Sequence, residues 1–384
     1  MPSHQGSERV GAKQRRTLCI TGYPGFIGRR LVARLAEQDR DAGFELLVQP
    51  KYVEEARRLA QQLPRPSRFE VLESDVAGMH LGLAGAEYVR LCDQVTEIWH
   101  LAAISYLGVP KEAARRVNVE GTRNVLELAR DCGSLQRLCH FSSAFVSGSR
   151  VGVVAEDELD AGQSFRSAYE ETKYQAEKLV RRAAKDLPIV IFRPATVVGD
   201  SKTGEIDRLD GPYYLSVLLV TSPLAAPLPL PGEGAAPLHV LPVDFLVEAA
   251  TTIAADPRAL GRTFHLVDPS PMSSRRVYEL IAEQVHRKVP KMSVPARAAE
   301  ALLRMPFLER IARPQRAALA YLNQLVFYNG LNTQELLAGT GLQCPPITRY
   351  LPKLVEFTRE YYRRRREEKS AIEDPLDSPL RARS

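Results

Sequence analysis

Tyr169 and Lys173, four positions apart, are the residues of this chain best suited to acid–base chemistry. That spacing puts two side chains on one face of a helix. A nearby ammonium disfavours the neutral phenol, so the tyrosine can release its proton more readily near neutral pH. A solvated helix face is the alternative interpretation, because such pairs are common. Upstream, Ser142 and Ser143 end a strand-like run, where a hydroxyl can donate to an oxygen that gains negative charge.

A glycine-rich segment from Thr21 to Gly28 provides the second chemical signal. It comes after the apolar run 18–20 and opens a helical pattern that begins at Phe26. A strand, a glycine-rich turn and a helix start can hold a pyrophosphate on backbone N–H groups. An ordinary turn is again the alternative for the segment taken alone. However, the glycine turn, the serine-bearing strand and the Tyr/Lys helix occur in the order that a hydride-transfer site requires.

The elements that would position these residues alternate along the first part of the chain. Such alternation of apolar runs and helical periods is typical of βαβ units and a parallel sheet. Strands are predicted at 17–20, 45–49, 68–72, 97–101, 137–141, 189–192 and 263–267. Helices are predicted at 26–38, 52–63, 85–93, 111–131 and 167–186. We therefore expect an α/β fold with a Rossmann-type, doubly wound parallel sheet.

The second half of the chain differs in composition and in the spacing of its apolar residues. Residues 200–243 are rich in Gly and Pro and are predicted to form a lid-like insertion in a Rossmann-type dinucleotide-binding domain that spans 16–270. Helical patterns return at 244–255, 274–288, 296–325 and 350–366. The region 271–366 is therefore expected to be a smaller, mainly helical substrate-binding region. Residues 1–15 and the charged tail 367–384 are predicted to be disordered.

Charge and cysteine content limit the binding partners and metal sites that we expect. The formal charge is +6, and part of it gathers in the run 363–366. Such a run is usually a solvated face, with a peripheral contact to an anionic membrane as the alternative. No aromatic-interleaved basic surface is apparent, so no nucleic-acid partner is expected. The five cysteines form no Cys-x-x-Cys pair, and no metal site is predicted.

Residues 1–15 lack the apolar core of a signal peptide, and we expect a cytoplasmic protein. The most apolar stretch, 213–230, contains three prolines, which argue against a membrane-spanning helix. The sequence leaves the oligomeric state open.

The chain resembles the extended short-chain dehydrogenase/reductase family. The resemblance covers about residues 16–270 and rests on seven segments: Thr21 to Gly28, Ser74 to Val76, His100 to Ala103, Asn118 to Thr122, Ser142-Ser143, Tyr169 to Lys173 and Arg193-Pro194. Residues 80–83 and 199–205 are similar to a narrower branch, which contains fatty acyl-CoA reductases and the thioester-reductase domains of carboxylic acid reductases.

This resemblance implies roles for individual residues. Ser143, Tyr169, Lys173 and Asn118 match the catalytic positions, although Asn118 could serve only to brace its helix. The candidate cofactor contacts are Gly22, Gly25, Phe26, Ile27, Gly28, Arg29, Lys51, Arg58, Asp75, Val76, Ala102, Tyr169, Lys173 and Pro194. Asp75 matches a family residue that accepts a hydrogen bond from the adenine amino group, with a simple turn or cap as the alternative.

NADP(H) is favoured over NAD(H) because of the residue types that come after the second strand. An acidic residue there binds the ribose 2′-OH, whereas basic residues accommodate a 2′-phosphate. Here the strand ends at Gln49, where the similar reductases usually have arginine, and no carboxylate occurs before Glu54. Arg29, Lys51 and Arg58 could supply positive charge.

Three functions compete. The first is reduction of a hydrophobic acyl thioester, bound to CoA or a separate carrier protein, or of the corresponding aldehyde. The second is a ketone reductase, alcohol dehydrogenase or sugar-nucleotide epimerase. The third is a noncatalytic dinucleotide-binding interaction protein, which the complete Ser143, Tyr169 and Lys173 set disfavours. The apolar residues after position 212 suit a lipid-like substrate, although an apolar stripe is more often core.

Overall fold

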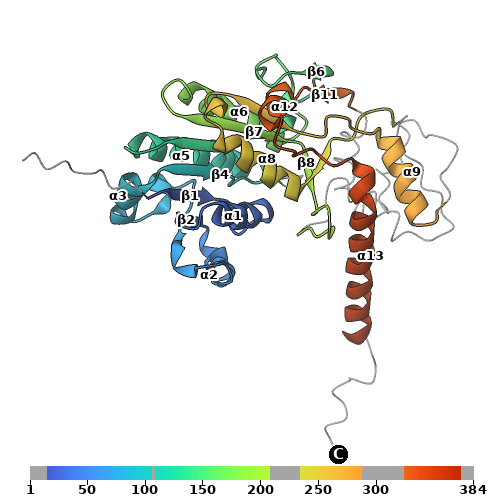
Figure 1. Ribbon diagram of the computed structural model, residues 1–384, viewed down its shortest axis with the longest axis horizontal. Coiled ribbons are helices and arrows are strands. Elements are labelled where there is room, and N and C mark those ends of the chain that lie inside the picture. Colours follow the sequence, from blue (N-terminus) through green and yellow to red (C-terminus); the bar gives the residue numbers. More distant parts are fainter. Residues whose placement is uncertain (1–14, 106–108, 208–233, 288–323, 373–384) are drawn as a thin grey trace, which may run out of the picture.

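A seven-stranded parallel sheet forms the centre of the computed structural model, which describes residues 15–105, 109–207, 234–287 and 324–372 (Figure 1). Across the sheet the strands are β10 (Thr263–Leu266), β7 (Ile189–Pro194), β5 (Arg137–Phe141), β4 (Glu97–His100), β1 (Thr17–Thr21), β2 (Gly43–Val48) and β3 (Phe69–Glu73). All seven predicted strands are confirmed. The strand order reverses between β1 and β4, and ligands of such sheets bind at the carboxyl ends beside that point.

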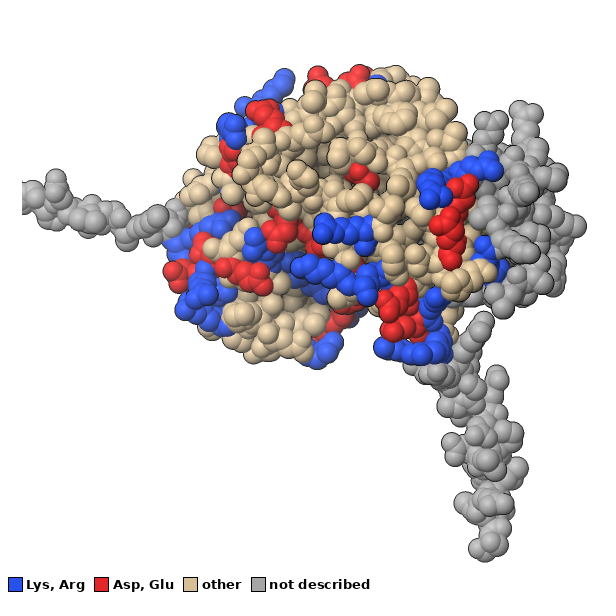
Figure 2. Space-filling view, turned by 45° about the vertical axis from the view of Figure 1, so that its right-hand side comes forward, with Lys and Arg blue, Asp and Glu red and all other residues tan. Residues whose placement is uncertain are grey.

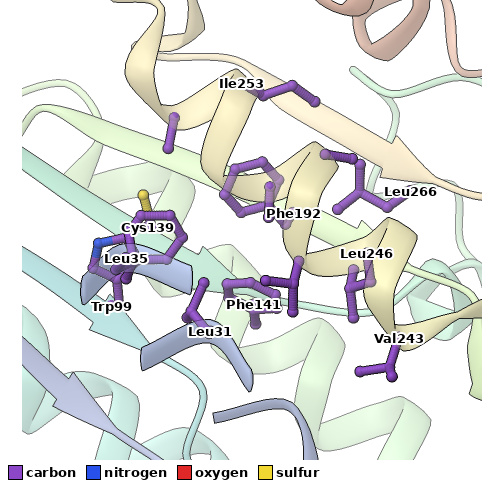
Figure 3. Close-up of a cluster of buried hydrophobic side chains, with 14 of the residues drawn as sticks. Leu31, Leu35, Trp99, Cys139, Phe141, Phe192, Val243, Leu246, Ile253 and Leu266 are labelled. Carbon is purple, nitrogen blue, oxygen red and sulfur yellow. The ribbon is translucent and has the colours of Figure 1, made fainter. Parts of the chain in front are cut away.

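Helices cover both faces of the sheet, because strands with apolar side chains on both faces must be shielded from water on both. One face packs against α1 (Phe26–Gln38), α2 (Val53–Ala60), α8 (Val243–Ala255) and α12 (Leu331–Leu337). The other face packs against α3 (Gly85–Gln94), α5 (Gly121–Asp131) and α6 (Ala168–Ala183). Figure 3 shows the first of these cores, where Leu31 of α1 and Leu246 of α8 lie over Trp99, Phe141 and Phe192 of the strands. The expected doubly wound fold is confirmed.

The predicted helix 111–131 is continuous but not uniform. It comprises α4 (Lys111–Arg115), a π-helical turn, η4 (Arg116–Glu120), and then α5. A π turn inside a helix is rare and frequently lies at a functional site. Sequence periodicity did not reveal it.

Two small parallel sheets were not predicted. β8 (Thr196–Val198) pairs with β9 (Val240–Pro242), and β6 (Gly152–Val154) pairs with β11 (Val326–Tyr328). Each strand has three residues, too few to show a period of two in a loop sequence. Leu336 and Leu337 of the unpredicted α12 join the core beside α8, so this segment returns to the main sheet.

The remaining helices form a third apolar cluster. α9 (Ser274–Gln284) packs with the first half of α13 (Ile347–Ile372) and with residues of β8 and β9. α13 continues beyond 366 and stands away from the body of the molecule (Figure 1). The helix thus extends to Ile372, into the segment predicted to be disordered, where Glu, Lys and Ala are good helix formers. The disorder of the tail stays a prediction.

Several predictions fall outside the described residues, namely the terminal segments 1–14 and 373–384, most of the expected helix 296–325, and the centre of the insertion 200–243. The division into domains stays a prediction. Within the described ranges, none of the helices is both long and apolar enough to cross a membrane.

Candidate active site

The glycine turn between β1 and α1 leaves no room for side chains. Gly22 has φ +89°, and a Cβ there would lie 2.9 Å from the backbone nitrogen of Ala102. A Cβ on Gly28 would lie 2.5 Å from the carbonyl oxygen of Gly22, so α1 begins directly against the turn. The turn thus brings the first residues of α1 close to the segment that follows β4, at the point where the strand order reverses.

The start of α1 fits the pyrophosphate of a dinucleotide. Phe26 and Ile27 open the helix, whose first backbone N–H groups have no partner within the helix. Among the described residues, no side chain caps this end, and the first turn carries no carboxylate. The helix dipole and these donors favour an anion here. Gly22, Gly25, Phe26, Ile27 and Gly28 form this turn and helix start, and their contact with a cofactor stays a prediction.

The three cations suggested for a 2′-phosphate differ in their surroundings. Arg29 donates to Asp207 at 2.9 and 2.6 Å and to Glu205 at 3.2 Å, so carboxylates already engage its guanidinium. Lys51 and Arg58 are both exposed, Lys51 in the turn three residues beyond β2 and Arg58 on α2. Lys51 lies over the ring of Tyr52. On the face shown in Figure 2, basic side chains are likewise interspersed with acidic ones.

Asp75 organises its own turn after β3. Its Oδ1 accepts from the backbone N–H of Ala77 at 3.0 Å, and its Oδ2 accepts from Arg116 at 2.7 Å. Val76 is buried, and its carbonyl accepts from Asn124 of α5 at 2.8 Å. The turn interpretation of Asp75 is thus observed, and its contact with adenine stays a prediction.

Ser143 and Tyr169 meet at the carboxyl end of β5. Ser143 precedes the short helix η5 (Ala144–Ser147), and its Oγ accepts from the backbone N–H of Phe145 at 3.2 Å. The side chain of Tyr169 lies beside the hydroxyl of Ser143. Burial raises the pKa of Tyr169, and the neighbouring Ser143 hydroxyl opposes this rise. The expected net lowering of that pKa is therefore not observed, because desolvation of the phenolate outweighs the favourable contact.

Lys173 lies one turn further along α6 and is buried. Its Nζ donates to the carbonyl oxygen of Phe141 at 2.6 Å. Burial lowers the pKa of Lys173 to about 8, against the opposing charge of Glu177. Since Lys173 binds the end of β5 and Tyr169 lies beside Ser143, the predicted pair faces the sheet and is not a solvated helix face.

Asn118 occupies the π turn and is almost fully buried. Its side chain accepts from the N–H of Ile104 at 2.8 Å and donates to the carbonyl of Ile104 at 3.1 Å. It also donates to Thr172 of α6 at 3.0 Å. Asn118 therefore braces the segment after β4 against the helix of Tyr169 and Lys173, as the bracing interpretation predicted.

His100 is part of a buried chain of hydrogen bonds behind these residues. Thr21 Oγ1 accepts from the N–H groups of Leu101 and Ala102, so its hydroxyl hydrogen points to His100 Nδ1, 2.8 Å away. His100 Nε2 then donates to Thr122 Oγ1 at 3.0 Å. Burial lowers the pKa of His100 to about 3, which keeps the ring neutral. His100 is thus a core histidine with both ring nitrogens hydrogen-bonded.

A buried ion pair beneath the site was not predicted from the sequence. Arg193 of β7 donates to Glu177 of α6 at 2.6 Å, and both side chains have zero exposed area. Ser142 Oγ donates to the same carboxylate at 2.6 Å, so Ser142 faces the interior. Pro194 ends β7 beside this pair and is buried. An arginine inside an otherwise apolar strand was the available signal, because such a residue needs a buried partner.

The chain matches known proteins over this same region. A family model described as male sterility protein matches residues 20–250. Glycine betaine reductase ATRR of Emericella nidulans is 29% identical over 283 residues, which cover 69% of this chain and 22% of that protein. Fatty acyl-CoA reductase wat of Drosophila melanogaster is 25% identical over 279 residues, which cover 62% of this chain and 53% of that protein. The chain thus spans only part of the length of these relatives.

Solved structures share the fold of this chain. The terminal R domain of the myxalamid biosynthetic pathway superposes with a TM-score of 0.73 at 26% identity, covering 90% of this chain and 92% of that domain. A UDP-glucuronic acid 4-epimerase from Bacillus cereus superposes with a TM-score of 0.63 at 19% identity, covering 90% and 99%, a likeness of fold alone. With the glycine turn and the α6 residues in place, the chain belongs to the male sterility protein family and is an NAD(P)-dependent oxidoreductase of the extended short-chain dehydrogenase/reductase type.

Proposed function

We propose that this protein is an NADPH-dependent reductase of a hydrophobic acyl thioester or of the corresponding aldehyde. The observation that carries the proposal is the position of Tyr169 beside Ser143, with the Lys173 ammonium one helical turn away. Two hydroxyl donors from different elements converge at the carboxyl end of β5, where the reducible carbonyl would lie. The family and relatives support the reductase class, and the substrate and the cofactor preference are our inference.

The chain's own residues would divide the chemistry among them. Tyr169 donates a proton to the carbonyl oxygen as negative charge develops, and Ser143 donates a second hydrogen bond to that oxygen. Lys173 stabilises the tyrosinate that remains and holds the cofactor ribose. When bound, the nicotinamide supplies the hydride. With a thioester, loss of the thiol from the reduced carbon would leave an aldehyde.

NADPH is preferred in this proposal because β2 is not succeeded by a carboxylate. Val48 ends the strand, and Gln49 and Pro50 lead into the exposed Lys51. We propose Lys51 and Arg58 as the phosphate contacts. Arg29 could join them only by leaving its bonds to Asp207 and Glu205.

The substrate class is supported by the relatives, which include a fatty acyl-CoA reductase and proteins named aldehyde reductases. Purified protein with NADPH would be offered acyl-CoAs of increasing length, matching aldehydes, small ketones and UDP-sugars, while NADPH loss and thiol release are measured. Each further buried methylene contributes about 0.8 kcal/mol, so kcat/KM should rise about fourfold per methylene until the pocket is full. Turnover confined to ketones or UDP-sugars would reject the proposal in favour of the second function.

A further inference from the structure

Three residues of α6 lie against three consecutive residues at the end of β5. Tyr169 lies beside Ser143, Lys173 Nζ donates to the Phe141 carbonyl, and Glu177 Oε2 accepts from Ser142 Oγ at 2.6 Å. The three helical residues are spaced by four, so they form one stripe that faces the sheet. Glu177 is the third member of the stripe that carries both proposed catalytic groups of the helix.

We infer that Glu177 is a positioning residue of the reductase site, which fixes the strand end that carries Ser143 and keeps Lys173 charged. The inference rests on the proposed function, because it assigns Glu177 a part in the same reaction.

The first part of this role is orientation. Ser142 is held from two sides, since its N–H donates to the Phe192 carbonyl at 2.7 Å and its Oγ donates to Glu177. Ser143 is the next residue, and its hydroxyl has to aim at the substrate oxygen. A shift of 1 Å in such a group can cost about 100-fold in rate. The bond from Ser142 to Glu177 therefore restrains the proposed oxyanion donor.

The second part is electrostatic. Glu177 is the carboxylate whose charge favours the protonated form of Lys173, while burial disfavours it. His100 of β4 and His140 of β5 also face Lys173, but burial holds the pKa of each well below its usual range, so both rings are neutral. Among the described residues, neither ring nitrogen of His140 has a hydrogen-bond partner. Lys173 thus depends on Glu177 for a compensating negative charge.

A purely structural role would require only that the Glu177 carboxylate stabilises the fold through its ion pairs with arginine. Arg193 donates to Glu177 through Nε at 3.0 Å and Nη2 at 2.6 Å, and Arg181 donates through Nε at 2.8 Å. A buried ion pair can often be replaced by uncharged residues without loss of stability. Removing both charges of the Glu177–Arg193 pair therefore separates its contribution to folding from its action on Lys173 and Ser142.

The test compares wild type, the double variant E177Q/R193Q and S142A. The double variant leaves no unpaired guanidinium at position 193, and loss of the negative charge should lower the pKa of Lys173. We expect the alkaline limb of kcat/KM, and the alkaline weakening of NADPH affinity measured by fluorescence, to move about one pH unit downward. S142A retains every charge, so kcat should fall about tenfold, while the alkaline pH dependence of kcat/KM and of NADPH affinity should be unchanged.

The inference would be overturned if the folded double variant had the pH dependence of wild type and S142A had the wild-type rate. If the double variant does not fold by circular dichroism, S142A decides the question, because a loss in kcat supports the role and an unchanged kcat contradicts it. Failure of the proposed function is a separate outcome, since wild type itself would then turn over neither acyl-CoAs nor aldehydes.

Discussion

The two ends of the expected cofactor site differ in how their charges are held. At the end of β5, Lys173, Glu177 and Arg193 are buried and bonded to one another or to the strand. Beyond β2, Lys51 and Arg58 are exposed. Buried polar groups must be satisfied and therefore keep fixed positions, whereas exposed cations can adapt to a ligand. Changes near β5 should thus alter catalysis, and changes beyond β2 should alter affinity alone.

The largest effect is expected at the buried end, from Y169F. The variant removes only the hydroxyl that donates the proton, so turnover should fall about 10²–10⁴-fold. The NADPH dissociation constant should change little, because Lys173 and the glycine turn are intact. Steady-state rates and fluorescence titration measure the two quantities, and a near-normal rate would show that Tyr169 is not the proton donor.

A pH effect is expected from Lys173, whose pKa is lowered to about 8 by burial. The protonated form is the active one, so activity is present below this pKa and is lost as pH rises through it. Above about pH 8, kcat/KM should fall tenfold per pH unit. K173R is the matched variant, because a guanidinium stays charged and its slower reaction should lack this limb. A wild-type rate that stays level to about pH 10, the ordinary range of lysine, would contradict the assignment.

A more modest effect is expected at the exposed end, from K51A. Loss of one charge-assisted bond to a 2′-phosphate should weaken NADPH binding about tenfold or more and leave NADH binding unchanged. R58A should act in the same direction. R57A is the control on the same helix, since Arg57 is bound to Glu54 at 3.0 Å and is not a proposed contact. Equal losses for NADPH and NADH would remove the basis for an NADPH preference.

The smallest effect is expected from D207N, which removes the negative charge of the main partner of Arg29 and one of its two acceptor oxygens. Partly exposed ion pairs are weak, so NADPH should bind tighter by at most about fivefold. NADH affinity is the internal control and should be unaffected. If D207N leaves NADPH affinity unchanged while K51A weakens it, Arg29 serves only to hold residues 205–207 against α1.

The sequence by itself determined the main elements and the chemistry they carry. Apolar runs and helical periods are local properties, so all seven strands of the main sheet were placed to within about two residues. The glycines from Gly22 to Gly28 and the pair Tyr169 and Lys173 are recognisable because turn geometry and helical spacing depend on neighbouring residues. Strands of three residues and the π turn at Asn118 leave no such local signal.

Only the tertiary structure decided which groups meet. Glu177 and Arg193 are 16 positions apart, Lys173 and Phe141 are 32 apart, and Arg29 and Asp207 are 178 apart. Those contacts depend on how helices and strands pack across the sheet, which local propensity does not specify. Burial then set the charge states, and so the pKa of Tyr169 is raised where the Tyr/Lys spacing alone predicted that it would be lowered.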